Sequence, residues 1–334
     1  MIRLSILDQS PVVEGRTAAD AINETMDLVV RADEWGYERY WFAEHHGSAS
    51  FASASPEIMI ANAAARTKNI RLGSGGILLG HASPLRVAES LRTLHALAPS
   101  RIDAGFGRAP GGDQRVMSAL GERPNESWQR LDEILIQLQD MKQPSNNGNV
   151  IAVPDGVPPP EVWVLGTSPS SAMEAGKRGL AYAFGAFIDP SHLTDALSAY
   201  HASFIPSTWN DKPRTMIATV AFVGDTEADA SRMARSSEQW FVESFLRSKN
   251  VRFPIVRDGQ QFTLLPVESI VRDMRRASVL IGSVEHVHER LLEMELRYAT
   301  SEISIVTITD DHALRVASYE RCASLISKRP PGQS

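Results

Sequence analysis

An acidic residue and two histidines stand side by side at Glu44, His45 and His46, directly after the apolar run 39–43. An imidazole with an ordinary pKa of about 6.5 exchanges protons at neutral pH, and a neighbouring carboxylate can orient it. We therefore predict that His45 and Glu44 take part in proton transfer. A packed histidine without chemistry is less favoured for three such groups together. A metal site is the weakest interpretation, because adjacent strand residues point to opposite faces and the spacing is not His-Glu-x-x-His.

A hydroxyl-rich loop, 166–171, joins an apolar run to the start of a helix. Its four hydroxyl groups belong to Thr167, Ser168, Ser170 and Ser171. Free backbone N–H groups and the positive end of a helix make such a loop a good phosphate site. An ordinary serine cap, the alternative, needs only one hydroxyl. Arg108 can add a charged contact through its guanidinium fork, or it forms a surface salt bridge.

Glycines interrupt a third apolar stretch at Gly73, Gly75 and Gly76. Glycine inside a strand usually marks a bulge or the close approach of another body to the backbone, and a flat aromatic ring would suit that space. The run 105–111 matches a dinucleotide-binding motif only loosely, because Pro110 takes the place of its third glycine. No Gly-x-Ser-x-Gly motif occurs, which disfavours hydrolases with a nucleophile elbow.

Strands and helices alternate along the chain in eight units, as the spacing of apolar residues indicates. The predicted strands are 2–7, 39–43, 70–79, 101–106, 162–165, 180–187, 215–223 and 302–308. This rhythm predicts a (β/α)₈ TIM barrel, whose active site lies at the carboxyl ends of the strands, where the polar groups above occur. A doubly wound sheet is the alternative, but it would place a glycine-rich turn directly after the first strand, and no glycine follows before Gly15. We expect one domain over 1–327, with inserted segments after strands four and seven, and a tail at 328–334.

The composition restricts the function classes. The 334 residues carry a net charge of −6 and no long basic run, which argues against nucleic acid or an anionic membrane as a partner. The single cysteine, Cys322, cannot form an internal disulfide or supply a cysteine-based metal site. No apolar stretch has the length of a membrane span or signal peptide. We expect a cytoplasmic protein that acts on a small molecule.

Four motifs, taken in order, resemble the bacterial luciferase-like flavin-dependent monooxygenases. They are Trp41-Phe-Ala-Glu44-His45-His46, Ile70-Arg-Leu-Gly-Ser-Gly-Gly76, His81-x-x-Pro84-x-x-Val87-Ala-Glu89 and Arg101-Ile-Asp103-x-Gly-x-Gly107-Arg108-Ala-Pro-Gly111. The resemblance covers most of the chain. It implies a (β/α)₈ barrel that takes reduced FMN (FMNH2) from a separate flavin reductase. It also implies that O2 is activated as a peroxide at the flavin C4a position, and that the protein is a homodimer.

The resemblance also implies roles for individual residues. His45 would be the acid or base near the flavin peroxide, with Glu44 beside it, and Gly75 and Gly76 would lie beneath the isoalloxazine ring. Arg108 would help to hold the FMN phosphate. The remaining phosphate contacts would come from Thr167, Ser168, Ser170 and Ser171. The luciferases often have a second phosphate-binding arginine, for which Arg123 and Arg130 are the nearest candidates here.

Two alternatives to an oxygenase stay open. The first is a hydride transferase of the same fold that uses a deazaflavin or NAD(P)H, and the second is a flavin-binding protein without catalysis. The substrate is expected to be organic and hydrophobic, and related sequences act in secondary metabolism. We expect the irregular segment 248–281 to select the substrate as a lid or pocket wall. Its apolar candidates are Phe253, Phe262, Leu264 and Leu265.

Overall fold

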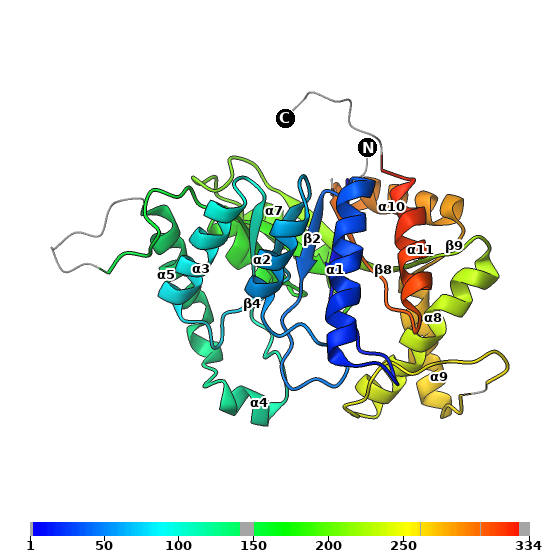
Figure 1. Cartoon of the computed structure of the whole chain (residues 1–334). Coiled ribbons are helices and arrows are strands. Elements are labelled where there is room, and N and C mark those ends of the chain that lie inside the picture. Colours follow the sequence, from blue (N-terminus) through cyan, green and yellow to red (C-terminus); the bar gives the residue numbers. More distant parts are fainter. Residues whose placement is uncertain (1–2, 141–149, 261, 301, 327–334) are drawn as a thin grey trace.

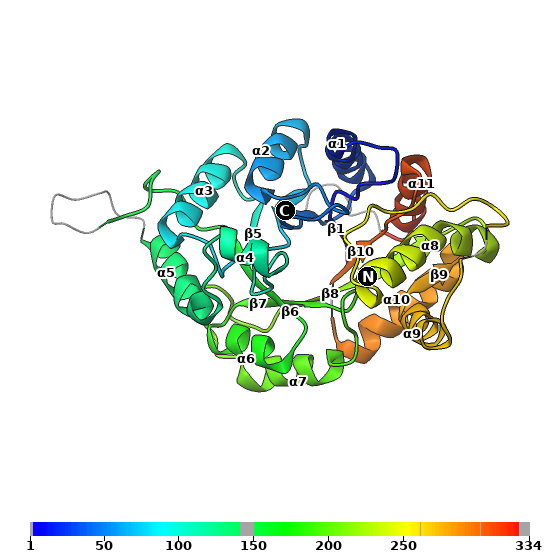
Figure 2. The same cartoon turned by 90° about the horizontal axis from the view of Figure 1, so that it is seen from below.

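Eight parallel strands close into a barrel that is surrounded by helices (Figures 1 and 2). The computed structural model describes residues 3–140, 150–260, 262–300 and 302–326. The barrel strands are β1 Arg3–Asp8, β2 Arg39–Phe42, β3 Arg71–Ser74, β5 Ile102–Gly107, β6 Glu161–Gly166, β7 Ala181–Gly185, β8 Thr215–Val223 and β10 Glu302–Val306. Strand β10 pairs with both β1 and β8, which closes the ring. The predicted (β/α)₈ barrel is confirmed; the predicted tail at 328–334 lies outside the described residues.

Each barrel strand is followed by a helix, and local signals fix where the helices begin. Thr17 and Asp20 form a reciprocal capping box at the first helix, and Gly36 ends it with a φ of 86°. Ser-Pro pairs begin the second, third and sixth helices, since proline lacks only an N–H that the first turn does not use. The helices after the strands are α1 Ala18–Trp35, α2 Pro56–Arg66, α3 Pro84–Leu97, α5 Ser127–Gln139, α6 Pro169–Lys177, α7 Leu193–Ser203, α8 Glu227–Phe241 and α11 His312–Ala323.

The third predicted strand is divided in two. Its second part is β4, Ile77–Leu78, and the peptide bond between Gly75 and Gly76 is cis. The Ser74 side chain takes over the pairing at the break: its Oγ accepts from Gly105 N at 3.0 Å and donates to Gly105 O at 2.9 Å. The break lies at the glycines that indicated a bulge or a close approach to the backbone, and the neighbouring strand β5 is the part of the chain that comes close.

The two inserted segments contain further elements. The first holds α4 Gln114–Ala119 and the short 3₁₀ helix η1 Pro124–Glu126. The second holds the π-helix η2 Val242–Leu246, α9 Pro266–Ser278, β9 Leu280–Gly282 and α10 Val284–Tyr298. Strand β9 was not predicted. It pairs with 221–223 of β8, which extend past the barrel partner β10 and whose backbone groups therefore need another partner.

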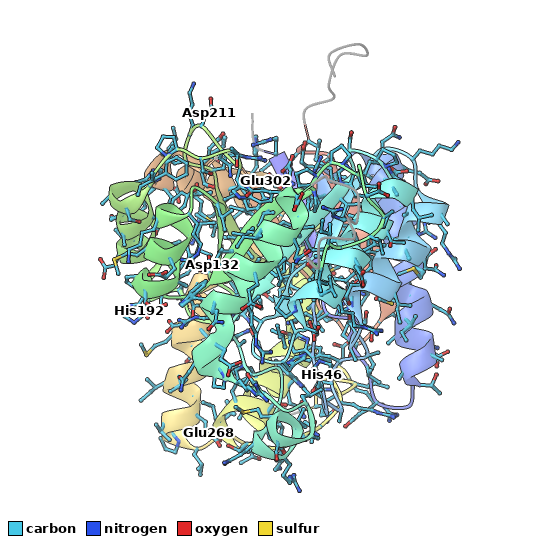
Figure 3. The ribbon with its side chains drawn as sticks, turned by 90° about the vertical axis from the view of Figure 1, so that its left-hand side faces the viewer. His46, Asp132, His192, Asp211, Glu268 and Glu302 are labelled. Atoms are coloured by element: carbon cyan, nitrogen blue, oxygen red, sulfur yellow. The ribbon has the colours of Figure 1, made fainter. Side chains whose placement is uncertain are left out.

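A buried charged layer fills the amino-terminal end of the barrel. Arg39 is 1% exposed and contacts Asp103 at 2.8 Å and Glu302 at 2.5 Å. These residues come from β2, β5 and β10, which are alternate strands of the ring, as expected for one interior layer. Figure 3 shows Glu302 at one end of the molecule and His46 toward the other. The amino-terminal end is thus occupied by ion pairs, and the space for a ligand lies at the opposite end.

Every helix among the described residues is too short or too polar to span a lipid bilayer.

Candidate active site

A cavity of about 620 Å³ lies at the carboxyl ends of the strands, within the range of roughly 300–1,000 Å³ typical of small-molecule sites. All eight barrel strands, or the loops that directly follow them, contribute residues to its wall. These include Leu7, Gln9, Glu44, His45, Gly75, Gly76, Gly107, Arg108, Thr167, Ser168, Ser171, Gly185, Phe187 and Ile188. Most of the wall is apolar. The predicted position of the site on the barrel therefore agrees with the geometry.

His45 faces this cavity and its ring packs against Phe51, with 4.5 Å between the ring centroids. Its backbone N–H donates to Ser53 O at 2.8 Å, which fixes the loop after β2. Its Nδ1 is buried and has no partner among the described residues. Burial, assisted by His46, lowers the pKa of His45 to about 4. The imidazole is therefore neutral at neutral pH, with one ring nitrogen able to accept a hydrogen bond or a proton.

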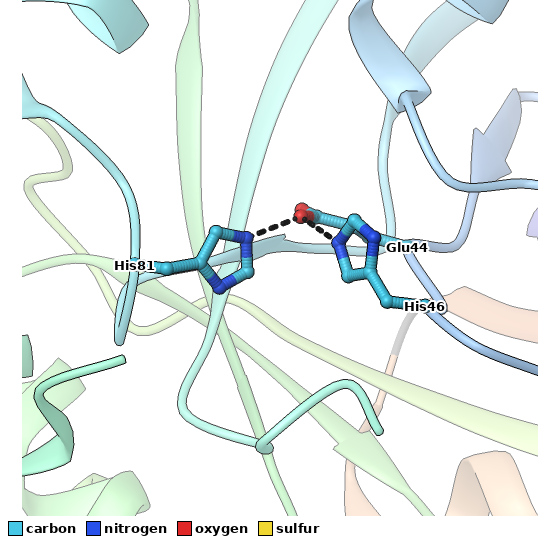
Figure 4. A group of neighbouring side chains, drawn as sticks. All are labelled: Glu44, His46 and His81. Carbon is cyan, nitrogen blue, oxygen red and sulfur yellow. Dashed lines mark hydrogen bonds and ion pairs between the residues drawn. The ribbon is translucent and has the colours of Figure 1, made fainter. Parts of the chain in front are cut away.

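Glu44 joins two imidazoles to one carboxylate (Figure 4). Its Oε1 lies 2.9 Å from Nε2 of His46 and 2.9 Å from Nε2 of His81, while its Oε2 accepts from Leu78 N at 3.0 Å. Burial raises the pKa of Glu44, but the hydrogen bonds with His81, His46 and Leu78 outweigh burial, so the pKa is lowered overall. The hydrogen bond that Glu44 accepts from His81 raises the pKa of His81. Glu44 is thus an ionised group that holds two rings in place.

The same three side chains form the set that could hold a metal ion, since the donor atoms of Glu44, His46 and His81 lie within 4.8 Å of one another. The sequence does not connect His81 with this set, because 36 residues separate it from Glu44. Each Nε2 instead finds the carboxylate as a hydrogen-bond partner. The atoms that could bind an ion are thus already bonded to one another, and the buried atom of this set left without a partner among the described residues is Nδ1 of His81, on the other side of its ring. We therefore assign the set no metal.

Gly75 and Gly76 form a side-chain-free part of the cavity wall. A Cβ on Gly76 would lie 2.8 Å from the backbone oxygen of Gly105, and one on Gly75 would lie 2.4 Å from Cδ1 of Leu7. The close approach of β5 and the Leu7 side chain therefore explains why the chain has glycine here. The result is a flat backbone surface between the His45 loop and β5.

The hydroxyl-rich loop lies at the start of α6, but its four hydroxyls differ in position. Thr167, Ser168 and Ser171 line the cavity, whereas Ser170 is exposed and lies outside the wall. Ser168 is the N-cap residue and accepts from Ser171 N at 3.3 Å. The Ser171 hydroxyl donates to Ser168 O at 2.8 Å and lies 3.1 Å from the Tyr182 hydroxyl. Thr167 makes no hydrogen bond through its side chain to the described residues, so its hydroxyl is available to a ligand.

Arg108 lies at the edge of the same cavity. Its guanidinium stacks over Trp128 at 4.8 Å from the ring centroid, and Arg178 lies 5.4 Å from the same ring. The two other arginines considered for phosphate are engaged elsewhere. Arg130 donates to Gly80 O and Ala82 O, and Arg123 is 68% exposed and 3.7 Å from Glu126. Of these three arginines, Arg108 is the one that lines the cavity together with the hydroxyl loop.

The second inserted segment contributes differently from the prediction. Phe253, Phe262, Leu264 and Leu265 do not line the cavity. Phe253 is fully buried behind Trp240, with 4.6 Å between the ring centroids, so this residue packs in the interior and does not contact a ligand in the cavity. The wall instead contains Arg275 of α9, together with Trp240 of α8 and Phe245 of η2, which precede 248–281. Sequence analysis did not identify these three, because helical spacing alone does not show which helix face turns toward the barrel.

Comparison with known proteins identifies the class. The family model for luciferase-like monooxygenases matches residues 2–301. The chain is 35% identical over 322 residues to the luciferase-like monooxygenase of Escherichia coli strain K12, covering 96% of this chain and 95% of that protein. It is 32% identical over 328 residues to the N-acetyl-S-alkylcysteine monooxygenase of Bacillus subtilis strain 168, covering 96% and 97%. The crystal structure of apo-MsnO8 has a TM-score of 0.85 at 33% identity and covers 97% of this chain and 98% of its own.

The chain therefore belongs to the luciferase-like monooxygenases, and it is an enzyme of that class, a flavin-dependent monooxygenase. The family resemblance seen in the four sequence motifs is confirmed.

Proposed function

We propose that the protein is the oxygenase of a two-component system. It binds FMNH2 supplied by a separate flavin reductase and uses O2 to oxygenate a small, mainly apolar organic molecule. One oxygen atom goes to the substrate and the other leaves as water, with two electrons from the flavin. The observation that carries this proposal is the arrangement of one cavity, where a neutral, unpartnered His45 faces a glycine surface and a hydroxyl loop lies at the other side.

The residues present fit FMN. At the start of α6, Pro169 has no N–H and the N–H of Ser171 is bonded to the Ser168 cap, so the N–H of Ser170 is the early amide left for a ligand. Thr167, Ser168 and Arg108 line the same cavity with donors suited to a phosphate. The backbone of Gly75 and Gly76 offers a flat surface to an aromatic ring. When bound, the reduced flavin would supply the electrons and the position at which O2 reacts. The apolar wall would keep water away from that position.

His45 is the residue to which we assign proton exchange with the bound groups. Because its pKa is about 4, it is a neutral donor and acceptor rather than a cation at neutral pH. Glu44 is assigned a positioning role, since it contacts His46 and His81 and fixes the loop that carries His45. The homodimer, the transient reductase, the cytoplasmic location and a substrate from secondary metabolism belong to the same proposal.

The proposal is tested by mixing the protein and FMNH2 anaerobically, measuring binding, and then adding O2. We expect the wild-type protein to bind FMNH2 and to change the time course of flavin reoxidation. The variant His45→Ala should bind FMNH2 with an affinity within about threefold of wild type. Its effect on the rate of flavin reoxidation should be at least tenfold smaller than that of wild type, because removal of a proton-transfer group typically costs about 10²–10⁴ in rate. His192→Ala, outside the cavity wall, is the control. Reoxidation at the rate of free FMNH2, without binding, would refute the proposal.

The deazaflavin alternative is separated by an affinity measurement. Quenching of flavin and deazaflavin fluorescence by the protein gives both dissociation constants under one condition. The proposal requires tighter binding of FMN than of the deazaflavin. Tighter deazaflavin binding, together with hydride transfer in the absence of O2, would favour the hydride transferase instead.

A further inference from the structure

The cavity contains a second arginine whose charge is not matched by the protein. Arg275, on α9, lines the cavity, and its guanidinium forms no hydrogen bond or ion pair with the described residues. The two other arginines nearby on the same helix are paired. Arg272 contacts Asp273 at 2.7 Å, and Arg276 contacts Glu238. Arg275 thus differs from its neighbours in having no acidic partner.

The guanidinium of Arg275 is held in place by an aromatic ring. It lies over Phe241, with 4.3 Å between its central carbon and the ring centroid. Burial lowers the pKa of Arg275 to about 10, so the group remains charged at neutral pH. Stacking uses the face of the guanidinium, and its N–H groups lie in its plane, where they can still meet a ligand. An unpaired charge removed from water is unfavourable, and an anion in the cavity would relieve that cost.

Arg275 lies away from the part of the cavity that we assign to FMN. Arg108 and the hydroxyl loop follow β5 and β6, and the glycine surface follows β3. Arg275 instead lies beside Val220 and Phe222 of β8, which is separated from β5 by β6 and β7. The cavity wall near this end includes Trp240, Phe245 and Val220. A molecule beside Arg275 would therefore meet a cation at one end and apolar groups along its length.

We propose that Arg275 binds a carboxylate of the substrate, and that the substrate is an organic acid with an apolar body. This inference rests on the proposed function, because that function places the flavin on the side of β3, β5 and β6. A carboxylate fits better than a neutral polar group, because its two oxygens match the fork of a guanidinium. The carboxylate fixes one end of the molecule, and the apolar body extends from it toward the flavin.

Binding of matched probes tests the inference without turnover. Octanoate, octanol and octylamine share a chain and differ in charge at one end. Their affinities are measured by calorimetry on wild-type protein, Arg275→Met, Arg275→Lys and the control Arg272→Met. The affinity for FMNH2 is measured anaerobically on the same four proteins, and thermal unfolding shows that each variant is folded.

We expect wild type to bind octanoate at least about tenfold more tightly than octanol, as a hydrogen-bonded charged group typically provides. Arg275→Met should remove this preference and leave octanol binding unchanged, while Arg275→Lys should keep part of it and Arg272→Met all of it. Equal affinity of wild type for octanoate and octanol would overturn the inference. An equal loss of FMNH2 and octanoate affinity in Arg275→Met would also overturn it, because Arg275 would then belong to the flavin site. A wild-type protein that binds octanoate through Arg275 but no FMNH2 would contradict the proposed function alone.

Discussion

His45 and Glu44 are neighbours in the chain, but the structure keeps His45 neutral and Glu44 ionised. His45 is kept neutral because burial disfavours its cation, whereas Glu44 is kept ionised by hydrogen bonds with His46 and His81. An ionised carboxylate beside a neutral imidazole is an arrangement found at sites that move protons, where the surroundings push two pKa values apart. The sequence gives the residue types, but the direction of each pKa shift follows from burial and hydrogen bonds in the folded protein.

The pH dependence of stability should report the lowered pKa of His45. In the unfolded chain His45 takes up a proton at about pH 6.5, whereas in the folded protein it does so only at about pH 4. As the pH falls from about 6.5 to 4, the unfolded state binds more protons than the folded state, so the contribution of His45 to stability decreases over this window. NMR titration of the imidazole and urea unfolding between pH 4 and 8 measure both effects. The variant His45→Asn should show a shallower decrease; a His45 midpoint at or above 6.5 would contradict the assignment.

At the scale of elements, the start of α6 combines a structural cap with the assigned phosphate site. Ser168 caps the helix and lines the cavity, Thr167 lines it without capping, and Ser170 does neither. The sequence showed four hydroxyls in one loop and could not separate these roles. The separation follows from helix geometry, which turns Ser170 outward and Ser171 toward Tyr182.

Three single variants separate the roles at α6. Ser168→Ala should lower the free energy of unfolding by about 1 kcal/mol through loss of the cap and weaken FMN binding several-fold. Thr167→Val should weaken FMN binding by a similar factor and leave stability unchanged, and Ser170→Ala should change neither. Urea unfolding and FMN titration give the two quantities for each variant. An effect of Ser170→Ala on FMN affinity as large as that of Thr167→Val would show that the assigned contacts are wrong.

The second inserted segment is attached to the loop that carries the catalytic candidates. Asn250 accepts from Ala49 N at 2.7 Å and donates to Gly47 O at 2.9 Å, and Phe253 forms a parallel bridge with Val13. Its position is therefore fixed by contacts with the β1 and β2 loops. Sequence analysis predicted that 248–281 selects the substrate, and that role stays a prediction. Within 248–281 the cavity contact is Arg275 of α9, and the neighbouring contacts, Phe245 of η2 and Trp240 of α8, precede that segment.

At the scale of the whole molecule, the ion pairs that stabilise the barrel and the residues that line the cavity lie at opposite ends of the barrel. The ion pairs of Arg39 lie at the amino-terminal end, and the cavity lies at the carboxyl end. Trp163 and Trp41 lie between these regions: Arg39 stacks over Trp163 at 5.0 Å, and Trp41 donates to Asp103 and lines the cavity. This division is expected for a barrel, whose two ends take different roles.

Replacing Arg39 should lower the free energy of unfolding and leave FMN affinity unchanged. Arg39→Met leaves the buried Glu302 without its arginine and removes one of the two arginines that contact Asp103, the other being Arg71. Removing one partner of a buried ion pair typically costs about 3–5 kcal/mol of unfolding free energy. The exposed pair Arg31–Asp27 provides a matched control, since Arg31→Met should cost no more than about 1 kcal/mol. Urea unfolding measures the difference, and FMN titration of the folded variants should give wild-type affinity. A strong loss of FMN affinity in Arg39→Met, with unchanged stability, would refute this separation.

The sequence by itself determined the barrel, the order of its strands along the chain and the family. Local patterns carry this information: apolar spacing marks strands and helices, Ser-Pro pairs mark helix starts, and the four motifs fall at strand ends. The tertiary structure alone decided which polar groups meet. The partnership of Glu44 with His81 and the unpaired charge of Arg275 depend on how segments far apart in the chain come together. No local pattern encodes them, because the closure of the barrel brings those segments together.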